Sequence, residues 1–149
     1  VASSLVNKGL KPNLILSAAQ PPHLREKHIK LSSLSIDELV QTLAQLNGVP
    51  QSWISAPELL ELFIDTLRAD FKMYENFIFP KNITHLNTLS VNGYEDLLCR
   101  PQYAFEWDLY FKKVSIDFIS GNHLFLNEIP KQFANKIVSY FNSFFNIIV

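Results

Sequence analysis

Two short apolar runs, each followed by a turn that carries a potential proton-transfer group, constrain the fold of this chain most. Residues 86–91 (LNTLSV) lead into a turn with Asp96. Residues 114–119 (VSIDFI) lead into a turn with His123. A helix-patterned segment separates the two runs, and this alternation predicts neighbouring parallel strands. Because the carboxyl ends of parallel strands meet at one edge of a sheet, we expect the carboxylate and the imidazole to come together there.

The remaining segments continue the alternation of strands and helices. Residues 2–8 predict the last turns of a helix that Gly9 ends, and residues 13–17 form a compact apolar run typical of a buried parallel strand. Residues 25–33 are polar and predict a loop, whereas the run from 114 to 119 alternates apolar and polar residues as an edge strand does. The segment from Pro130 predicts a last helix that packs on the sheet. The fold class is therefore α/β, with parallel strands and flanking helices.

An insertion of two helices without a strand is predicted at about residues 34–80. Ser35 and Glu38 have the spacing of a capping box, and Pro57 is well placed to open a longer helix that Pro80 ends. Apolar side chains recur at helical spacing along that second helix: Leu60, Phe63, Ile64, Leu67, Phe71 and Tyr74. The pattern alone is equally typical of an ordinary packed core.

Composition excludes several classes of function. With 149 residues, 48% of them hydrophobic, the chain has the size and composition of one packed domain. A formal net charge of -1 provides no electrostatic footprint for nucleic acid or for an anionic membrane, so neither partner is predicted. A single cysteine and the lack of a signal-like segment favour a cytoplasmic location.

The candidate catalytic residues each have a competing interpretation. Glu95 is a rival for the role of acid beside Asp96, and His123 could be a loop residue bonded to the backbone. Cys99 lies close to the acid, but no strand-turn-helix elbow surrounds it, so we interpret it as a small apolar residue that fills space. The other histidines have no spaced ligand partners, and we predict neither a metal nor a cofactor.

Several motifs along the chain point to a family. They are residues 17–23 (SAAQPPH), 37–39 (DEL), 46–50 (LNGVP), 57–60 (PELL), 67–71 (LRADF), 93–96 (GYED), Trp107 and residues 121–126 (GNHLFL). In this order they resemble the type II thioesterases, the stand-alone acyl-thioester hydrolases that serve nonribosomal peptide, polyketide and fatty acid synthases. The resemblance covers nearly the whole chain.

The resemblance implies a partial domain and assigns roles within it. Residues 1–149 would be the C-terminal part of an α/β-hydrolase thioesterase domain, and the insertion at about 34–80 would be a lid over an acyl-binding cleft. Asp96 would be the triad acid and His123 the general base. The lid residues that would bind substrate are Leu60, Phe63, Ile64, Leu67 and Phe71. The implied partners are an acyl or peptidyl carrier protein bearing a phosphopantetheine thioester, and the missing N-terminal half of the same domain.

Three departures from the family pattern affect the expected activity. Leu97 stands where many members have Pro, and Asn122 replaces the second Gly before the histidine. More seriously, the 149 residues contain no Gly-x-Ser-x-Gly, so the nucleophile and its oxyanion donors are not among them. Because acyl transfer by a serine triad requires all of these groups, we expect this chain alone to be inactive.

Two classes of function are therefore predicted. The first is an enzyme, in which this chain and an upstream half together hydrolyse acyl thioesters on a carrier domain. The second is a non-catalytic remnant or split-gene half that acts at most as a binding module. A Gly-His-Ser-x-Gly motif shortly upstream of Val1 would favour the enzyme, and a true start at Val1 would favour the remnant.

Overall fold

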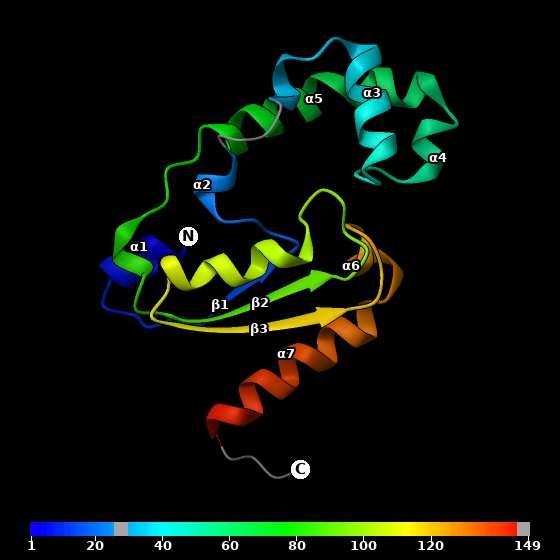
Figure 1. The fold of residues 1–149 in the computed structure, drawn as a ribbon. Helices are drawn as coiled ribbons and strands as arrows, with labels where there is room; N and C mark the ends of the chain where they lie inside the picture. Colours follow the sequence, from blue (N-terminus) through cyan, green and yellow to red (C-terminus); the bar gives the residue numbers. More distant parts are fainter. Residues whose placement is uncertain (26–29, 146–149) are drawn as a thin grey trace. The chain divides into compact units, whose positions relative to one another are not determined.

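The computed structural model describes residues 1–25 and 30–145, which form two compact units (Figure 1). The first unit comprises residues 1–20 and the chain from Pro80 onward, and the second comprises Pro21–Phe79. The elements of the first unit are α1 (Ala2–Asn7), β1 (Leu14–Ser17), the 3-10 helix η2 (Lys81–Ile83), β2 (Asn87–Gly93), the 3-10 helix η3 (Pro101–Leu109), β3 (Lys113–Ile119), α6 (Phe125–Glu128) and α7 (Pro130–Phe145). Those of the second are α2 (Pro22–Arg25), the 3-10 helix η1 (Leu31–Ser33), α3 (Ile36–Gln45), α4 (Gln51–Ile54) and α5 (Pro57–Glu75).

The first unit contains a parallel sheet with the strand order β1-β2-β3. Leu14 pairs with Thr88 on β2, and β2 pairs along its whole length with β3, from Asn87 and Lys113 to Gly93 and Ile119. Among the described residues β3 is an edge strand, as its alternating pattern predicts. The predicted α/β fold with parallel strands is confirmed. The strand β1 is half-buried rather than fully buried, because only one of its edges is paired within the described residues.

The central strand β2 is covered on both faces. Leu89 and Val91 lie on one face in a core cluster with Ile119, Phe125 and Tyr140, and α7 packs against this side of the sheet. Thr88, Ser90 and Asn92 alternate with them and are also buried. Figure 1 shows η3 along the opposite face from α7, and the Trp107 indole of η3 donates a hydrogen bond to the Ala19 carbonyl oxygen at 3.1 Å. This double cover holds the carboxyl ends of the strands in place.

The segment before β3 differs from its prediction. The sequence predicts a helical segment between the two apolar runs, and the structure has the 3-10 helix η3 there, which ends at Leu109. In a 3-10 helix residues three apart eclipse one another, and the buried Ala104 and Trp107 have this spacing. The sequence pattern identified a helical segment but did not distinguish three residues per turn from 3.6.

The second unit has helices and no strand among its described residues. Ser35 caps α3 with both bonds of a capping box, and the hydrogen bonds from the Ser35 hydroxyl and amide lower the pKa of Glu38 from its ordinary value. Leu39, Leu43, Val49 and Ile64 form the core of this unit. The short helix α4 was not predicted, since four residues carry too little periodicity to indicate a helix.

Two boundaries in the second unit also differ from expectation. The long helix α5 ends at Glu75, before the expected stop at Pro80, and the amides of Asn76 and Phe77 cap it by donating to the carbonyl oxygens of Lys72 and Tyr74. Short helical turns occur at Pro22–Arg25 and at Leu31–Ser33, and the second lies in the stretch 25–33 where a loop is predicted; residues 26–29 lie outside the described residues. Among the described helices, none is both long and apolar enough to cross a membrane.

Candidate active site

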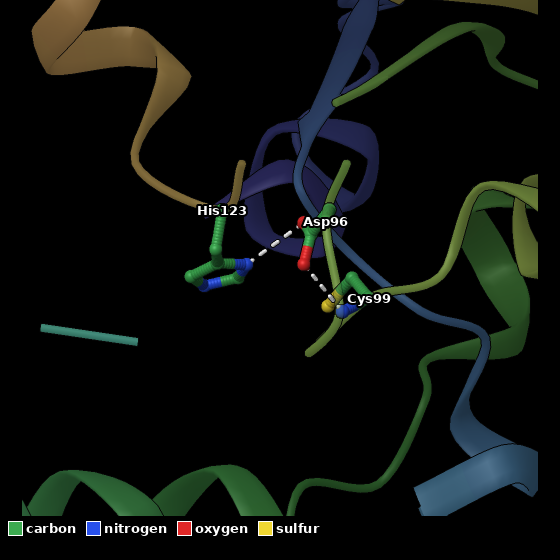
Figure 2. Close-up of side chains that lie close together, drawn as sticks. All are labelled: Asp96, Cys99 and His123. Carbon is green, nitrogen blue, oxygen red and sulfur yellow. Dashed lines mark hydrogen bonds and ion pairs between the residues drawn. The ribbon is translucent and has the colours of Figure 1, made fainter. Parts of the chain in front are cut away.

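Asp96 and His123 meet at the carboxyl edge of the sheet. Asp96 lies in the turn after β2, and His123 lies in the loop after β3. His123 Nδ1 is 2.9 Å from Asp96 Oδ2, and Figure 2 shows the imidazole directed at the carboxylate (Figure 2). The adjacent parallel strands produce this contact, because they deliver the two following turns to the same edge. The contact predicted from the two apolar runs is present.

The Asp96 carboxylate is fully buried and held from two sides. Its Oδ1 accepts hydrogen bonds from the backbone amides of Leu98 at 2.9 Å and Cys99 at 2.7 Å, and Oδ2 contacts His123. Its side chain has no exposed surface, whereas the His123 ring is 22% exposed. The amides fix the rotamer of the carboxylate. The Asp96 side chain is therefore buried and held in one orientation, whereas the His123 ring is partly exposed and accessible to a reacting group.

This arrangement can perform proton transfer. When Nδ1 carries the proton and donates it to Asp96, Nε2 keeps a lone pair that can accept a proton. Nε2 has no hydrogen-bond partner among the described residues. If Nε2 takes up a proton, the buried carboxylate stabilises the resulting imidazolium. The pair is thus arranged so that the imidazole can accept a proton from a third group.

Glu95, the rival acid, has a different contact. Its carboxylate accepts a hydrogen bond from the Gly121 amide at 2.5 Å, in the loop that leads to His123. Asp96 is therefore the acid that contacts the imidazole, as preferred from the sequence.

Cys99 is buried beside the pair, as shown in Figure 2. Its Sγ and one ligand atom each from Asp96 and His123 lie within 4.8 Å of one another. However, both oxygens of the carboxylate are already engaged by N–H groups. The cluster is consistent with a hydrogen-bonded acid and imidazole, and Cys99 contributes its amide to Asp96. An aspartate in a turn often bonds to the backbone amide two residues ahead, so the position of Asp96 in its turn could have indicated these amide bonds from the sequence.

The side chains proposed from the sequence to bind substrate lie in the second unit. Ile64 is buried in its core, and Phe71 packs against that core. Phe63 is 39% exposed and stacks on Trp53 at a centroid distance of 5.1 Å, and Leu67 is half-buried. The Leu60 side chain lies outside the described residues. The apolar stripe therefore includes both core positions and partly exposed ones.

The sheet order and the position of the acid-imidazole pair define a protein of the α/β-hydrolase fold. The family model described as "Thioesterase domain" matches residues 1–144, and the chain belongs to this family. The predicted family is thereby confirmed.

Individual relatives agree with this assignment. The chain is 30% identical over 144 residues to the probable anguibactin biosynthesis thioesterase AngT of Vibrio anguillarum, covering 91% of this chain and 56% of AngT. It is 28% identical over 120 residues to the medium-chain S-acyl fatty acid synthase thioesterase of Rattus norvegicus, covering 76% of this chain and 44% of the rat protein. The chain thus spans about half the length of the curated relatives that it matches.

Solved structures also resemble this one. A mutant of YbtT, the type II thioesterase from the yersiniabactin NRPS/PKS pathway, has a TM-score of 0.77 at 26% identity, covering 94% of this chain and 58% of YbtT. ClbQ from the colibactin NRPS/PKS pathway has a TM-score of 0.78 at 20% identity, covering 95% of this chain and 62% of ClbQ. The latter likeness shows a shared fold.

Proposed function

We propose that this chain carries the acid and the base of a thioester hydrolase with a Ser-His-Asp mechanism, and that the serine lies in sequence outside these 149 residues. The observation that carries the proposal is the 2.9 Å contact between His123 Nδ1 and Asp96 Oδ2 in a chain of the thioesterase family. The sequence contains no Gly-x-Ser-x-Gly to supply the nucleophile.

The geometry supports each proton transfer of such a mechanism. Nε2 of His123 takes the proton of the serine hydroxyl as the oxygen attacks the thioester carbonyl carbon. The tetrahedral intermediate collapses to an acyl-enzyme and a thiolate, which receives the proton from the imidazolium. Water then attacks the acyl-enzyme with the same base, which releases the carboxylic acid and restores the serine. Asp96 holds the imidazole tautomer and stabilises its cation throughout, and the two amides on Oδ1 keep the carboxylate in place.

The proposed substrate is an acyl group joined by a thioester to the phosphopantetheine arm of an acyl or peptidyl carrier protein. The names of the relatives support this class, since AngT and YbtT are named for biosynthetic pathways and the rat protein for fatty acid synthase. We further propose residues 34–80 as the lid of the acyl-binding cleft. Its helical composition without a strand among the described residues supports the lid assignment.

The alternative is a non-catalytic remnant that acts at most as a binding module. The absence of the nucleophile motif from the 149 residues favours it. The two functions differ in one experiment, because only the enzyme gains turnover when the rest of its domain is supplied.

We expect the 149-residue chain alone to hydrolyse acyl-pantetheine no faster than background, because its sequence contains no Gly-x-Ser-x-Gly to supply the nucleophile and the oxyanion donor beside it. Co-expression with the proposed N-terminal half should produce turnover. The open edge of β1 supports such complementation, because among the described residues β1 pairs with a strand on one side only. The measurement is thiol release from acyl-pantetheine by the chain with and without that half.

The control for this assay is the same pair of preparations with His123→Ala. Turnover by the chain alone that disappears in this variant would show that the 149 residues contain their own nucleophile. Failure of the complemented protein to turn over any acyl-pantetheine would favour the remnant.

The lid assignment predicts different effects for two positions on α5. In the complete protein, Leu67→Trp should shift the chain-length preference toward short acyl groups, because a bulky side chain on the inner face of a lid narrows the acyl channel. The matched variant Ile64→Ala should instead lower stability by about 2 to 5 kcal/mol, since Ile64 belongs to the core of the second unit. Hydrolysis rates across acyl lengths and melting curves of both variants are the measurements. An unchanged profile with a large loss of stability in Leu67→Trp would make this stripe ordinary core.

A further inference from the structure

The turn that carries Asp96 and the loop that carries His123 are joined by backbone hydrogen bonds. The Tyr94 amide donates to the Ile119 carbonyl at 2.9 Å, and the Glu95 amide donates to the Gly121 carbonyl at 3.1 Å. These bonds continue the pairing of β2 with β3 beyond the last residues of the strands. The two loops therefore leave the sheet as a connected pair.

The Glu95 side chain adds a second bond to the same residue. Its Oε2 accepts from the Gly121 amide at 2.5 Å, so the backbone and side chain of Glu95 engage both the N–H and the C=O of Gly121. Gly121 has φ +114, a conformation that L side chains rarely adopt. The two bonds hold this backbone in place two residues before His123.

The two members of the catalytic pair are fixed by different groups. The carboxylate of Asp96 is held by the amides of its own turn. Within the loop of His123, the Asn122 Oδ1 accepts from the Leu124 amide at 2.7 Å, and Asn122 Nδ2 donates to Glu128 at 3.3 Å, but these bonds stay on the histidine side. Apart from the His123 contact itself, Glu95 provides the side-chain bond that connects the turn of the acid to the loop of the base among the described residues.

We propose that Glu95 is a positioning residue that sets the distance between Asp96 and His123 by holding Gly121. The inference deepens the proposed function and rests on it. Glu95 touches neither the imidazole nor the reacting atoms in this assignment, and it acts through the backbone. A misplacement of about 1 Å at a reacting group can cost about 100-fold in rate, so a single bond that fixes the loop has a measurable effect on turnover.

The Glu95 carboxylate could affect His123 in two ways, through its hydrogen bond to Gly121 or through its negative charge. Glu95→Gln removes the charge and keeps a carbonyl oxygen that can accept from the Gly121 amide. Glu95→Ala removes both the charge and the hydrogen-bond acceptor. The comparison of the two variants therefore assigns the effect to the bond or to the charge. Asp108→Ala is the control for loss of an exposed acid, since Asp108 lies on η3 and makes no hydrogen bond or ion pair with another described residue.

In the complete protein, we expect Glu95→Ala to lower kcat about 10- to 100-fold with KM changed little, because the loss concerns the geometry of the pair and not substrate binding. Glu95→Gln should stay within about fivefold of the parent, because it replaces a charge-assisted bond with a neutral one. Asp108→Ala should match the parent. The measurements are kcat and KM for an acyl-pantetheine, across pH.

Proton NMR supplies a readout that does not depend on activity. The His123 Nδ1 proton bonded to Asp96 should give a low-field resonance that Glu95→Ala weakens or shifts and Glu95→Gln retains. Equal losses of activity in both variants with this resonance intact would assign the effect to charge and overturn the proposal, as would a fully active Glu95→Ala. If the parent protein shows no turnover, the proposed function fails, but the resonance still tests the positioning role.

Discussion

His123→Ala should abolish thioester turnover in the complete protein, and Asp96→Asn should lower kcat by about 10⁴, by analogy with the loss of the correct tautomer in a serine triad. The physical reason is the 2.9 Å contact between Nδ1 and Oδ2, which holds the proton on Nδ1 and leaves Nε2 free to act as the base. An amide at position 96 can donate to Nδ1 and so stabilise the wrong tautomer. The measurement is the single-turnover rate with an acyl-pantetheine, which isolates chemistry from product release.

Glu95→Gln provides the control for this assignment of the acid. It changes the neighbouring carboxylate, which contacts Gly121 and not the imidazole. If Glu95→Gln were the more damaging of the two acid changes, Asp96 would be the wrong acid. Melting curves of all three variants distinguish a loss of chemistry from a loss of folded protein.

Gly93→Ala should produce the second large effect, at a position with no side chain. A Cβ on Gly93 would lie 2.4 Å from the Gly121 carbonyl oxygen and 2.7 Å from that of Asn122. Both are backbone atoms of the loop that carries His123, so the loop must move away from the turn of Asp96. We expect a loss of stability of about 1 to 3 kcal/mol, typical of overpacking. We also expect turnover to fall by about 100-fold or more, because the acid and base are displaced.

Gly9→Ala is the matched control for this variant. Gly9 has φ +79, and a Cβ there would meet no atom within 4 Å. Its substitution should cost about 1 kcal/mol through backbone strain and leave kcat unchanged. Urea titrations and acyl-pantetheine assays of both variants in the complete protein test the difference. A Gly93→Ala protein with parental kcat would show that the two loops can separate without loss of the pair.

The order of strands and the pairing of the functional residues could be read largely from local patterns. The run at 86–91 lies in β2 from residue 87 onward, the run at 114–119 lies in β3, and each is followed by the residue expected to function. A parallel pair of adjacent strands brings the two carboxyl ends together whatever the details of packing, and this is why the contact of Asp96 with His123 was predictable. The capping box at Ser35 was predictable for a similar reason, because it depends on residues only three apart.

Other features depend on contacts between residues far apart in the chain. The periodicity of α5 indicates one apolar stripe. Only the tertiary packing shows that Ile64 on this stripe is buried in the core whereas Phe63 is partly exposed. The 3-10 helix η3 packs against β2 and β3, and its Trp107 indole reaches the Ala19 carbonyl oxygen across 88 positions of sequence. Local propensity contains no information on such contacts.

The sequence by itself determined the α/β class, the family motifs and the two turns that carry the acid and the imidazole, because these depend on short-range pattern and on the direction of neighbouring strands. The tertiary structure decided which of two adjacent acids faces the imidazole and what the other one does. Asp96 and Glu95 are consecutive and chemically alike, so strand periodicity does not distinguish them, and only the family resemblance favoured Asp96. The path of the backbone after β2 buries one carboxylate under two amides and directs the other to Gly121, and this path is set by the pairing with β3.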